Sequence, residues 1–281
     1  MSLSIELSGL IEISHYRGSI LLEQRVVNNA VQKAAATAVA TGLASGANNK
    51  ITHMQVELES TSGQGSGQNA QKPMFVPTNI NTPSAGETGW SVGTNVYRGK
   101  GSVTITGTHT SNGSYPNIDT LKIGYSSGGT NFVAYAEHTL SPTAITVETG
   151  DKVEITWYIG SPDPNSIPFF NDSIADCLAA GASVGRPSHL GYATYSGGSI
   201  SNIRRVAISS YTVDDTPTNT QDALYTSTQF TGGAAETPEA DDQVGIFGTS
   251  NELWAYDASP VFDISGGTNY VLHGHFQVSW S

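Results

Sequence analysis

One short segment of the sequence matches the motif of a serine hydrolase. Residues 124–128 read G-Y-S-S-G, the G-x-S-x-G spacing in which a serine stands on a sharp turn between a strand and a helix. A Gly-Gly pair and the alternating segment 132–136 follow, and this pattern predicts a β-hairpin where the motif needs a helix. We therefore expect Ser126 to lie in a hairpin turn and the chain to be no enzyme.

Histidine spacing offers a second candidate chemistry. His273 and His275 are two residues apart, so both lie on one face of a strand, as two ligands of a metal site could. No cysteine or carboxylate pair stands beside them, and we expect no metal there. His53 and His189 each follow Thr or Ser at a predicted strand start, where a structural hydrogen bond is the expected role.

Acidic residues and the single cysteine suggest no further chemistry. Asp214-Asp215 and residues 239–242 are acidic pairs in predicted loops, without the alternating spacing of a calcium loop. Cys177 lies in an apolar helical segment and is predicted to be a small core residue. We therefore expect no cofactor and no intrachain disulfide.

The four tryptophans are Trp90, Trp157, Trp254 and Trp280, and such rings can stack on sugars or fill a core. Trp157 and Trp280 end alternating strands at corresponding places, so we expect both to pack in the core or an interface. Trp90 stands in a long polar loop and is an interface candidate. Carbohydrate binding would rest on Trp90, Trp254 and the tyrosine-rich turns.

Composition narrows the class of protein. The chain of 281 residues carries a net charge of −12, with 13% charged residues and 31 glycines, which favours a mainly β fold rich in turns. Its 12 Lys and Arg are scattered, so we expect no nucleic-acid partner. No apolar run has the length of a membrane span. The N-terminus lacks the pattern of a signal peptide, and assembly in a reducing cytoplasm is expected.

The order of predicted elements repeats once along the chain. The first half predicts strands 3–14 and 19–27, a helix 30–44 capped by Asn28 or Asn29, strand 51–58, a long loop 60–95, and strands 102–106, 121–125, 132–136 and 152–159. The second half predicts helix 174–180 and strands 188–192, 205–210, 244–248, 253–256 and 275–280. In this scheme segment 205–210 corresponds to segment 101–106.

This order predicts two tandem, related β-sandwich-like domains, each with one short flanking α-helix. The first domain is residues 1–160 and the second is residues 169–281, a diverged duplicate. The proline-rich segment 161–168 would be an extended linker between them.

Four motifs carry a resemblance to a group of tailed-bacteriophage structural proteins. They are R-V-V-N at 25–28, L-A-S-G at 43–46, I-T-H-M-Q-V at 51–56, and a closing unit at 136–157 that ends G-D-K-V-E-I-T-W. The resemblance covers most of residues 3–159, and it departs from the family at 55–59 and in the long loop. It implies a virion component, assembled in the host cytoplasm, of the tail, neck, fibre base or capsid decoration.

The long loop is where we expect contacts with other virion proteins or with copies of the chain. It is polar, yet it holds the apolar residues Met74, Phe75, Val76, Ile80 and Trp90, which should become ordered against a partner. The N-terminal strands could likewise add to a neighbour's sheet edge. A threefold arrangement is implied by the resemblance alone. The alternative function is a receptor- or carbohydrate-binding module of a phage fibre.

Overall fold

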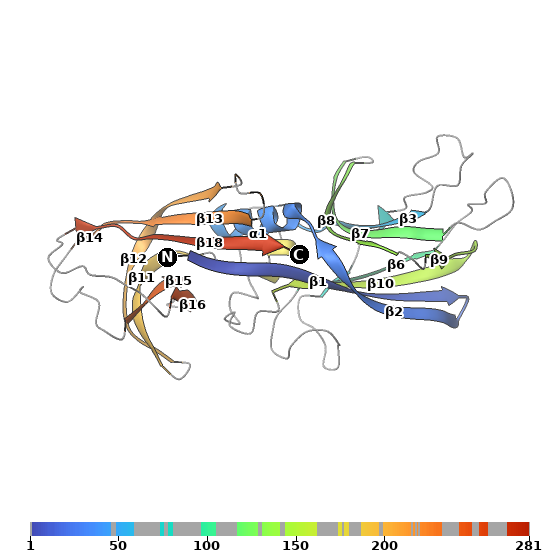
Figure 1. The fold of residues 1–281 in the computed structure, drawn as a ribbon, viewed down its shortest axis with the longest axis horizontal. Coiled ribbons are helices and arrows are strands. Elements are labelled where there is room, and N and C mark those ends of the chain that lie inside the picture. The colour runs from blue at the N-terminus through green and yellow to red at the C-terminus, as the bar shows by residue number, and fades with distance from the viewer. Residues whose placement is uncertain are drawn as a thin grey trace.

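The computed structural model describes most of the chain, and every structural statement below refers to that part. The described residues are 2–45, 49–58, 74–75, 78–80, 97–104, 117–128, 131–140, 144–161, 174–175, 177–179, 187–196, 199–214, 216, 218, 220–231, 242–248, 253–257 and 269–280. They form an elongated, mainly β protein (Figure 1). No helix among them is long and apolar enough to span a membrane.

The elements of the first half are β1 (Ser2–Arg17), β2 (Ile20–Val31), α1 (Lys33–Ser45), β3 (His53–Leu58), β4 (Met74–Phe75), β5 (Thr78–Ile80), β6 (Tyr97–Thr104), β7 (Asn117–Gly128), β8 (Asn131–Thr139), β9 (Ile145–Thr146) and β10 (Asp151–Gly160). Those of the second half are β11 (His189–Ser196), β12 (Ser199–Asp214), β13 (Thr220–Ser227), β14 (Phe230–Thr231), β15 (Asp242–Phe247), β16 (Leu253–Asp257), β17 (Asn269–Tyr270) and β18 (His273–Trp280). The predicted mainly β class is confirmed.

Strand β1 joins the two halves of the chain. Its first part, residues 2–7, pairs in parallel with β18, and its second part pairs in antiparallel fashion with β10 on one edge and β2 on the other. Gly18, which has a φ of 60°, makes the tight turn into β2, where glycine carries no Cβ penalty. The expectation that the N-terminal strands add to a neighbour is therefore wrong for β1 along residues 9–17, and it stays a prediction for β2.

Helix α1 begins later than predicted and lies in a different place. Asn28 and Asn29 belong to β2, which continues to Val31, so neither caps the helix. The helix buries residues nearly all round, namely Ala35, Ala36, Ala38, Val39, Ala40, Leu43 and Ala44. A helix that is apolar all round needs cover on more than one side. Accordingly, α1 packs against β12, β13 and β18 as well as β8, between the halves and not on the flank of its own half.

The two halves contain strand pairs in the same order. The first half has the order β8-β7-β3-β4, and the second has β16-β15-β11-β12, with every pair antiparallel. Beyond these strands, β5-β6-β10 in the first half corresponds to β12-β13-β18 in the second. The long strand β12 thus takes the place of both β4 and β5. Segment 205–210 spans both parts of β12, since Arg205 to Ala207 pair with β11 and Ile208 to Ser210 with β13, and its predicted match to 101–106 stays a prediction.

The residues just before β3 and β11 make the same kind of backbone hydrogen bond. The Thr52 N–H donates to the Gly124 carbonyl over 2.9 Å, and the Ser188 N–H donates to the Phe247 carbonyl over 2.9 Å. Gly124 lies in β7 and Phe247 in β15, which are corresponding strands in the order above.

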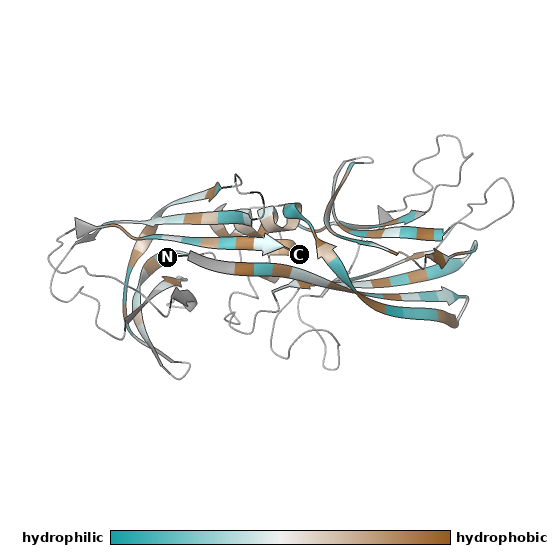
Figure 2. Ribbon diagram, in the orientation of Figure 1, coloured by the Kyte–Doolittle hydropathy of each residue, from teal (hydrophilic) through white to brown (hydrophobic). Residues whose placement is uncertain are grey.

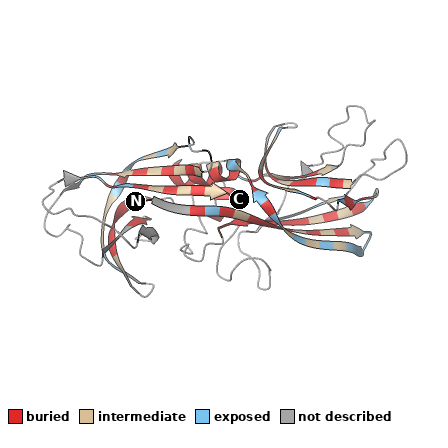
Figure 3. Ribbon diagram, viewed as in Figure 1, coloured by how far each residue is buried: buried red, intermediate tan, exposed pale blue. Residues whose placement is uncertain are grey.

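Buried residues of both halves belong to one continuous hydrophobic cluster. Figure 3 shows that buried positions run along the strands and through α1, and Figure 2 shows apolar and polar residues alternating along the strands. Strand β10 illustrates the pattern, because Val153, Ile155 and Trp157 are all buried on one face. The predicted linker 161–168 lies outside the described residues apart from Ser161, and the division into two domains stays a prediction.

We expect Gly124→Ala to lower the free energy of unfolding by about 2 kcal/mol because of overpacking. A Cβ at this position would lie 1.9 Å from the backbone oxygen of Val133, which cannot move without breaking the β7–β8 pairing. The matched control is Gly274→Ala, whose Cβ would lie 3.3 Å from the flexible Leu190 side chain. Urea unfolding of both variants tests this, and equal stability of the two would contradict it.

Candidate functional site

The two strand-start histidines make the hydrogen bonds expected of them. His53 Nδ1 lies 2.8 Å from the Thr52 hydroxyl, and His189 Nδ1 lies 2.7 Å from the Ser188 hydroxyl. Arg205 Nη1 is 2.9 Å from the same nitrogen of His189. Burial and the Arg205 charge lower the pKa of His189, which favours a neutral ring that accepts hydrogen bonds. The structural interpretation of both histidines is confirmed.

The G-x-S-x-G segment is the end of a strand. Residues 124–128 close β7, and β8 begins at Asn131 and pairs back onto it. The backbone N–H of Ser126 donates to the Thr52 hydroxyl over 3.1 Å. The predicted β-hairpin is confirmed, but Ser126 pairs with Phe132 inside the first strand of that hairpin, so the expectation that it lies in the turn is wrong. The strand–turn–helix geometry of a nucleophile elbow does not occur at Ser126.

We expect Ser126→Ala to change the free energy of unfolding by less than about 0.5 kcal/mol, as for most exposed or half-exposed positions. We also expect a serine-directed fluorophosphonate probe to leave the wild-type chain unlabelled, since Ser126 lies in a paired strand and not on the exposed turn of a nucleophile elbow. Mass spectrometry of the treated protein is the measurement. Stoichiometric labelling at Ser126, lost in the alanine variant, would overturn the hairpin interpretation.

The remaining polar candidates make local contacts. His273 Nδ1 lies 3.2 Å from the Thr226 hydroxyl. The Asp214 carboxylate accepts hydrogen bonds from the Thr216 hydroxyl and N–H, and these bonds lower the pKa of Asp214. Among the described residues, no three or more His, Cys, Asp or Glu side chains gather as a metal site would require. Asp215 and residues 239–241 lie outside the described residues.

Several predicted core and interface residues can be placed. Cys177 is a buried thiol in the core and Trp157 is fully buried, as predicted, while Trp280 packs against the core as a partly buried ring. Trp254 lies in β16, but its side chain is not among those described, and Trp90 lies outside the described residues.

The loop candidates fall partly inside the sheets. Met74 and Phe75 form β4, which pairs with β3, and Ile80 belongs to β5, which pairs with β6. Their side chains are not described, and Val76 lies outside the described residues. The long loop therefore contributes strands to its own sheets, and its contacts with a partner stay a prediction.

Sequence reasoning missed a buried ionic cluster around Asp151, at the start of β10. His15 Nε2 lies 2.8 Å from one carboxylate oxygen, and the Arg17 guanidinium donates to both oxygens over 2.9 and 3.1 Å. The Glu148 N–H donates to the same carboxylate over 2.9 Å. The turn from Glu148 to Asp151 contains Gly150, whose φ of 94° is in the region that favours glycine. The cluster thus ties the end of β1 to β10.

The cluster keeps Asp151 ionised although its side chain is only 1% exposed. Burial opposes ionisation, but hydrogen bonds from Arg17, the Glu148 N–H and His15, together with the Arg17 charge, outweigh it. They hold the pKa of Asp151 well below its usual range. The Gly-Asp pair of the closing motif is a sequence signal for this cluster, but the side-chain partners His15 and Arg17 lie more than 130 positions away.

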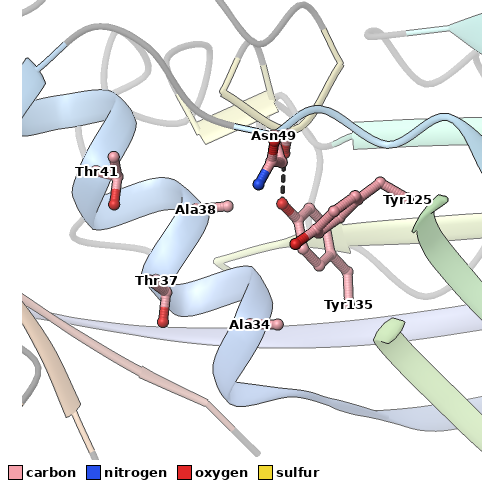
Figure 4. Close-up of a pocket in the computed structure, with 7 residues that line it drawn as sticks. All are labelled: Ala34, Thr37, Ala38, Thr41, Asn49, Tyr125 and Tyr135. Carbon is pink, nitrogen blue, oxygen red and sulfur yellow. Dashed lines mark hydrogen bonds between the residues drawn. The ribbon is translucent and has the colours of Figure 1, made fainter. Parts of the chain in front are cut away.

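A pocket of about 560 Å³ lies between α1 and the strands β7 and β8 (Figure 4). Its helical wall is made of small side chains, and its other wall carries Tyr125 and Tyr135 with ring centroids 5.6 Å apart in an edge-to-face arrangement. The Tyr135 hydroxyl donates to the Asn49 carbonyl, and burial raises the pKa of Tyr135. The lining residues are Ala34, Thr37, Ala38, Thr41, Asn49, Tyr125 and Tyr135. Hydroxyl groups beside aromatic rings can hold an uncharged polar ring.

The outer edge of β2 is a third feature, and it belongs to the N-terminal strands that the sequence analysis expected to contact a neighbour. Its residues 20–27 pair with β1 on one edge, with a shift of one residue at Leu22, and no described strand pairs with the other edge. Ile20 is 66% exposed, and Leu22 and Val26 are 46% and 48% exposed. Figure 1 shows β2 as an outermost strand, and Figure 3 shows exposed positions along it. We call residues 20–27 the β2 edge.

The three features differ in what they can do. The Asp151 cluster stabilises the fold, the pocket can hold a small ligand, and the β2 edge, with which no described strand pairs, presents apolar side chains to another protein. A scan against family models and searches of curated proteins and of solved structures found no match to this chain.

Proposed function

We propose that the chain is a structural component of a tailed-phage virion that acts by packing against other proteins. The observation that carries this proposal is that residues of the closing motif hold the fold together. Asp151, Ile155 and Trp157, from the closing motif of the resemblance, build the junction between strands and the core. A motif whose residues serve the fold is typical of a scaffold, whereas a motif of an enzyme places polar groups around a cleft.

The β2 edge supports the same proposal. Soluble proteins protect the edges of their sheets with charges, prolines or short strands. The β2 edge carries Glu23, Arg25 and a register shift at Leu22, yet its large apolar side chains remain exposed, with Leu21 also 48% exposed. An edge of this kind is expected where another protein covers it. Capsid decoration, neck, and tail or fibre base are the positions that the resemblance allows.

We further propose that the chain arose by duplication of one unit into two tandem sandwich-like domains. The shared order of strand pairs and the shared entry into β3 and β11 support this. Superposing β8-β7-β3-β4 on β16-β15-β11-β12 in an experimental structure should bring Thr52-His53 onto Ser188-His189. A best superposition that places β3 on any strand other than β11 would refute the duplication.

Gene deletion and complementation test the virion role. Phage lacking the gene should yield particles that electron microscopy shows to be incomplete or unstable, and the wild-type chain supplied in trans should restore them. The Ser126→Ala variant should restore them equally well, since Ser126 has no catalytic part in the proposal. Normal, infectious particles without the gene would refute the role.

The pocket favours a second candidate, binding of a neutral saccharide. Tyr125 offers a half-buried ring, and Thr41 and Asn49 offer polar groups beside it. Chemical-shift changes on titration with a panel of mono- and disaccharides should then occur at the pocket and be lost in Tyr125→Ala. The matched control is Tyr16→Ala, on β1 away from the pocket. Shifts absent at every concentration would exclude this candidate.

A further inference from the structure

We infer that the turn of the β1–β2 hairpin of one copy of the chain docks into the pocket between α1 and the strands β7 and β8 of a second copy, so that copies join head to tail. We call residues 18–22 the hairpin tip and the pocket the α1 pocket. This deepens the proposed assembly role, on which the choice of a protein partner rests, by naming the partner and both contact surfaces.

The hairpin tip presents three consecutive aliphatic side chains to solvent. Residues 17–22 are all exposed, and Ile20, at 66%, is the most exposed large apolar side chain in the described part of the chain. The pairing of β2 with β1 shifts by one residue here, so Leu22 is an extra residue in the register. A bulge of this kind re-aims side chains. Three neighbouring apolar groups in solvent are therefore typical of a contact surface.

The base of the tip is held in a fixed position. Arg17 donates to both oxygens of the buried Asp151 carboxylate over 2.9 and 3.1 Å, and it lies 2.8 Å from Glu148. Gly18 makes the turn with a φ of 60°. A contact element that is already fixed loses little conformational entropy on docking, so the tip is suited to enter a preformed site.

The charges beside the tip favour a protein partner over a lipid surface. Segments that bind membranes combine apolar side chains with basic groups that meet anionic lipid. Here the neighbouring cations already form ion pairs, namely Arg17 with Asp151 and Glu148, Arg25 with Glu23, and Lys152 with Glu154. Residues 18–22 themselves carry no charge, so the tip fits an uncharged site on a protein.

The α1 pocket matches the tip in chemistry and size. All of its lining residues are uncharged, and Tyr125 and Tyr135 form one wall (Figure 4). Aliphatic side chains can therefore enter it without leaving a charge buried and unpaired. Its volume of about 560 Å³ is typical of sites that enclose a small ligand. Such a space holds side chains of the tip while the strands of the hairpin stay outside.

The charges around the two surfaces also complement each other. Lys33 and Lys50 are exposed and directly adjoin the lining residues Ala34 and Asn49 in the sequence. The ion-paired groups at the base of the tip are two arginines and three carboxylates, a net charge of −1; they are Arg17, Arg25, Glu23, Glu148 and Asp151. A basic rim facing a slightly acidic base favours this orientation of docking.

The contact joins two different surfaces, so it does not close on itself in a pair. Figure 1 shows that β1 and β2 run to one end of the elongated molecule while α1 lies near its middle, so the tip reaches the pocket of another copy and not its own. A docked pair still has one open pocket and one open tip. Association of this type continues until a ring closes, or it grows as a fibre. The threefold arrangement implied by the resemblance is one such ring.

Mixing two variants of the full-length chain tests the contact. Ile20→Asp puts a charge on the tip and keeps the pocket, whereas Ala34→Phe fills the pocket and keeps the tip. In sedimentation velocity the wild-type chain should exceed the monomer mass as its concentration rises. Each variant alone should need at least about tenfold more protein to associate, because a central anchor of the contact is lost.

An equimolar mixture of the two variants should form a 1:1 heterodimer and nothing larger, since the mixture contains one intact tip and one intact pocket. The heterodimer would also show that both variants are folded. Thr41→Tyr fills the same pocket if Ala34→Phe loses the circular dichroism of the wild type. The matched control is Val271→Asp, which adds the same charge at a residue that is 42% exposed and outside the tip, and it should assemble as the wild type does.

Four results would overturn the inference. They are a monomeric wild-type chain at every concentration, a variant that assembles alone as the wild type does, a mixture of two folded variants without heterodimer, and flotation of the wild-type chain with phosphatidylcholine vesicles that is lost in Ile20→Asp. The last result would assign the tip to a lipid surface. A monomeric chain that still complements the phage gene would overturn the contact and leave the virion role standing, so the two failures are distinguishable.

Discussion

Trp157→Ala is expected to lower the free energy of unfolding by about 4 kcal/mol, the usual cost of emptying a large aromatic site. Trp157 is fully buried in β10, a strand that pairs with β1 on one side and β6 on the other. The cavity would therefore lie between strands whose backbone positions are fixed by pairing, and the surroundings could not collapse to fill it. Equilibrium unfolding in urea, followed by circular dichroism, measures the change.

Trp157→Phe separates the volume of the side chain from its polar atom. The indole Nε1 is buried without a hydrogen-bond partner among the described residues, and a buried unpaired donor carries a desolvation cost. Phenylalanine removes that donor while it keeps one aromatic ring, so we expect a loss of only about 1 kcal/mol. Equal losses in the alanine and phenylalanine variants would contradict a role in filling the core.

Asp151→Asn is expected to lower the free energy of unfolding by about 3 kcal/mol, because it breaks a buried ionic cluster by removing one partner. The change leaves Arg17, which donates to both carboxylate oxygens, facing an amide. The matched control is Glu148→Gln. Its carboxylate lies 2.8 Å from the same Arg17, but the two side chains are 37% and 46% exposed, so that pair should contribute less than about 1 kcal/mol.

The contribution of Asp151 should depend on pH with a defined sign. Its pKa in the folded protein is lowered, and its unfolded-state pKa is about 3.9. Stability from this group is thus complete above about pH 4 and is lost as the pH falls through the folded-state pKa. The stability difference between wild type and Asp151→Asn should shrink as the pH falls below about 4. A difference that persists unchanged in acid, or equals that of Glu148→Gln, would contradict this account.

Local pattern predicted the strands whose buried face is apolar. In β10 the alternation of Val153, Ile155 and Trp157 was sufficient, and the hairpin after Gly128 followed from the Gly-Gly pair. The sequence does not predict strand β13, because its buried face carries Gln221, Ala223, Tyr225 and Ser227. Two of these four residues are polar, so the buried face is only slightly more apolar than the opposite one.

Features that depend on distant parts of the chain could not be predicted. The helix start was placed at Asn28 or Asn29 because asparagine is a common cap, yet pairing with β1 and β8 keeps both residues in β2. The parallel pairing of β1 with β18 joins the two ends of the chain. The pocket needs Tyr125 and Tyr135 to face α1, an arrangement that follows from packing and not from spacing along the chain.

Quantitative mass spectrometry of gradient-purified phage particles tests the central proposal, a structural role in the virion, most directly. Peptides of this chain should co-purify with intact particles at a fixed ratio to the major capsid protein, and the ratio should not fall on further purification. Hundreds of copies per particle would indicate decoration, and a small symmetric number would indicate neck, tail or fibre base. Peptides found only in the soluble fraction of infected cells, and none in purified particles, would contradict the proposal.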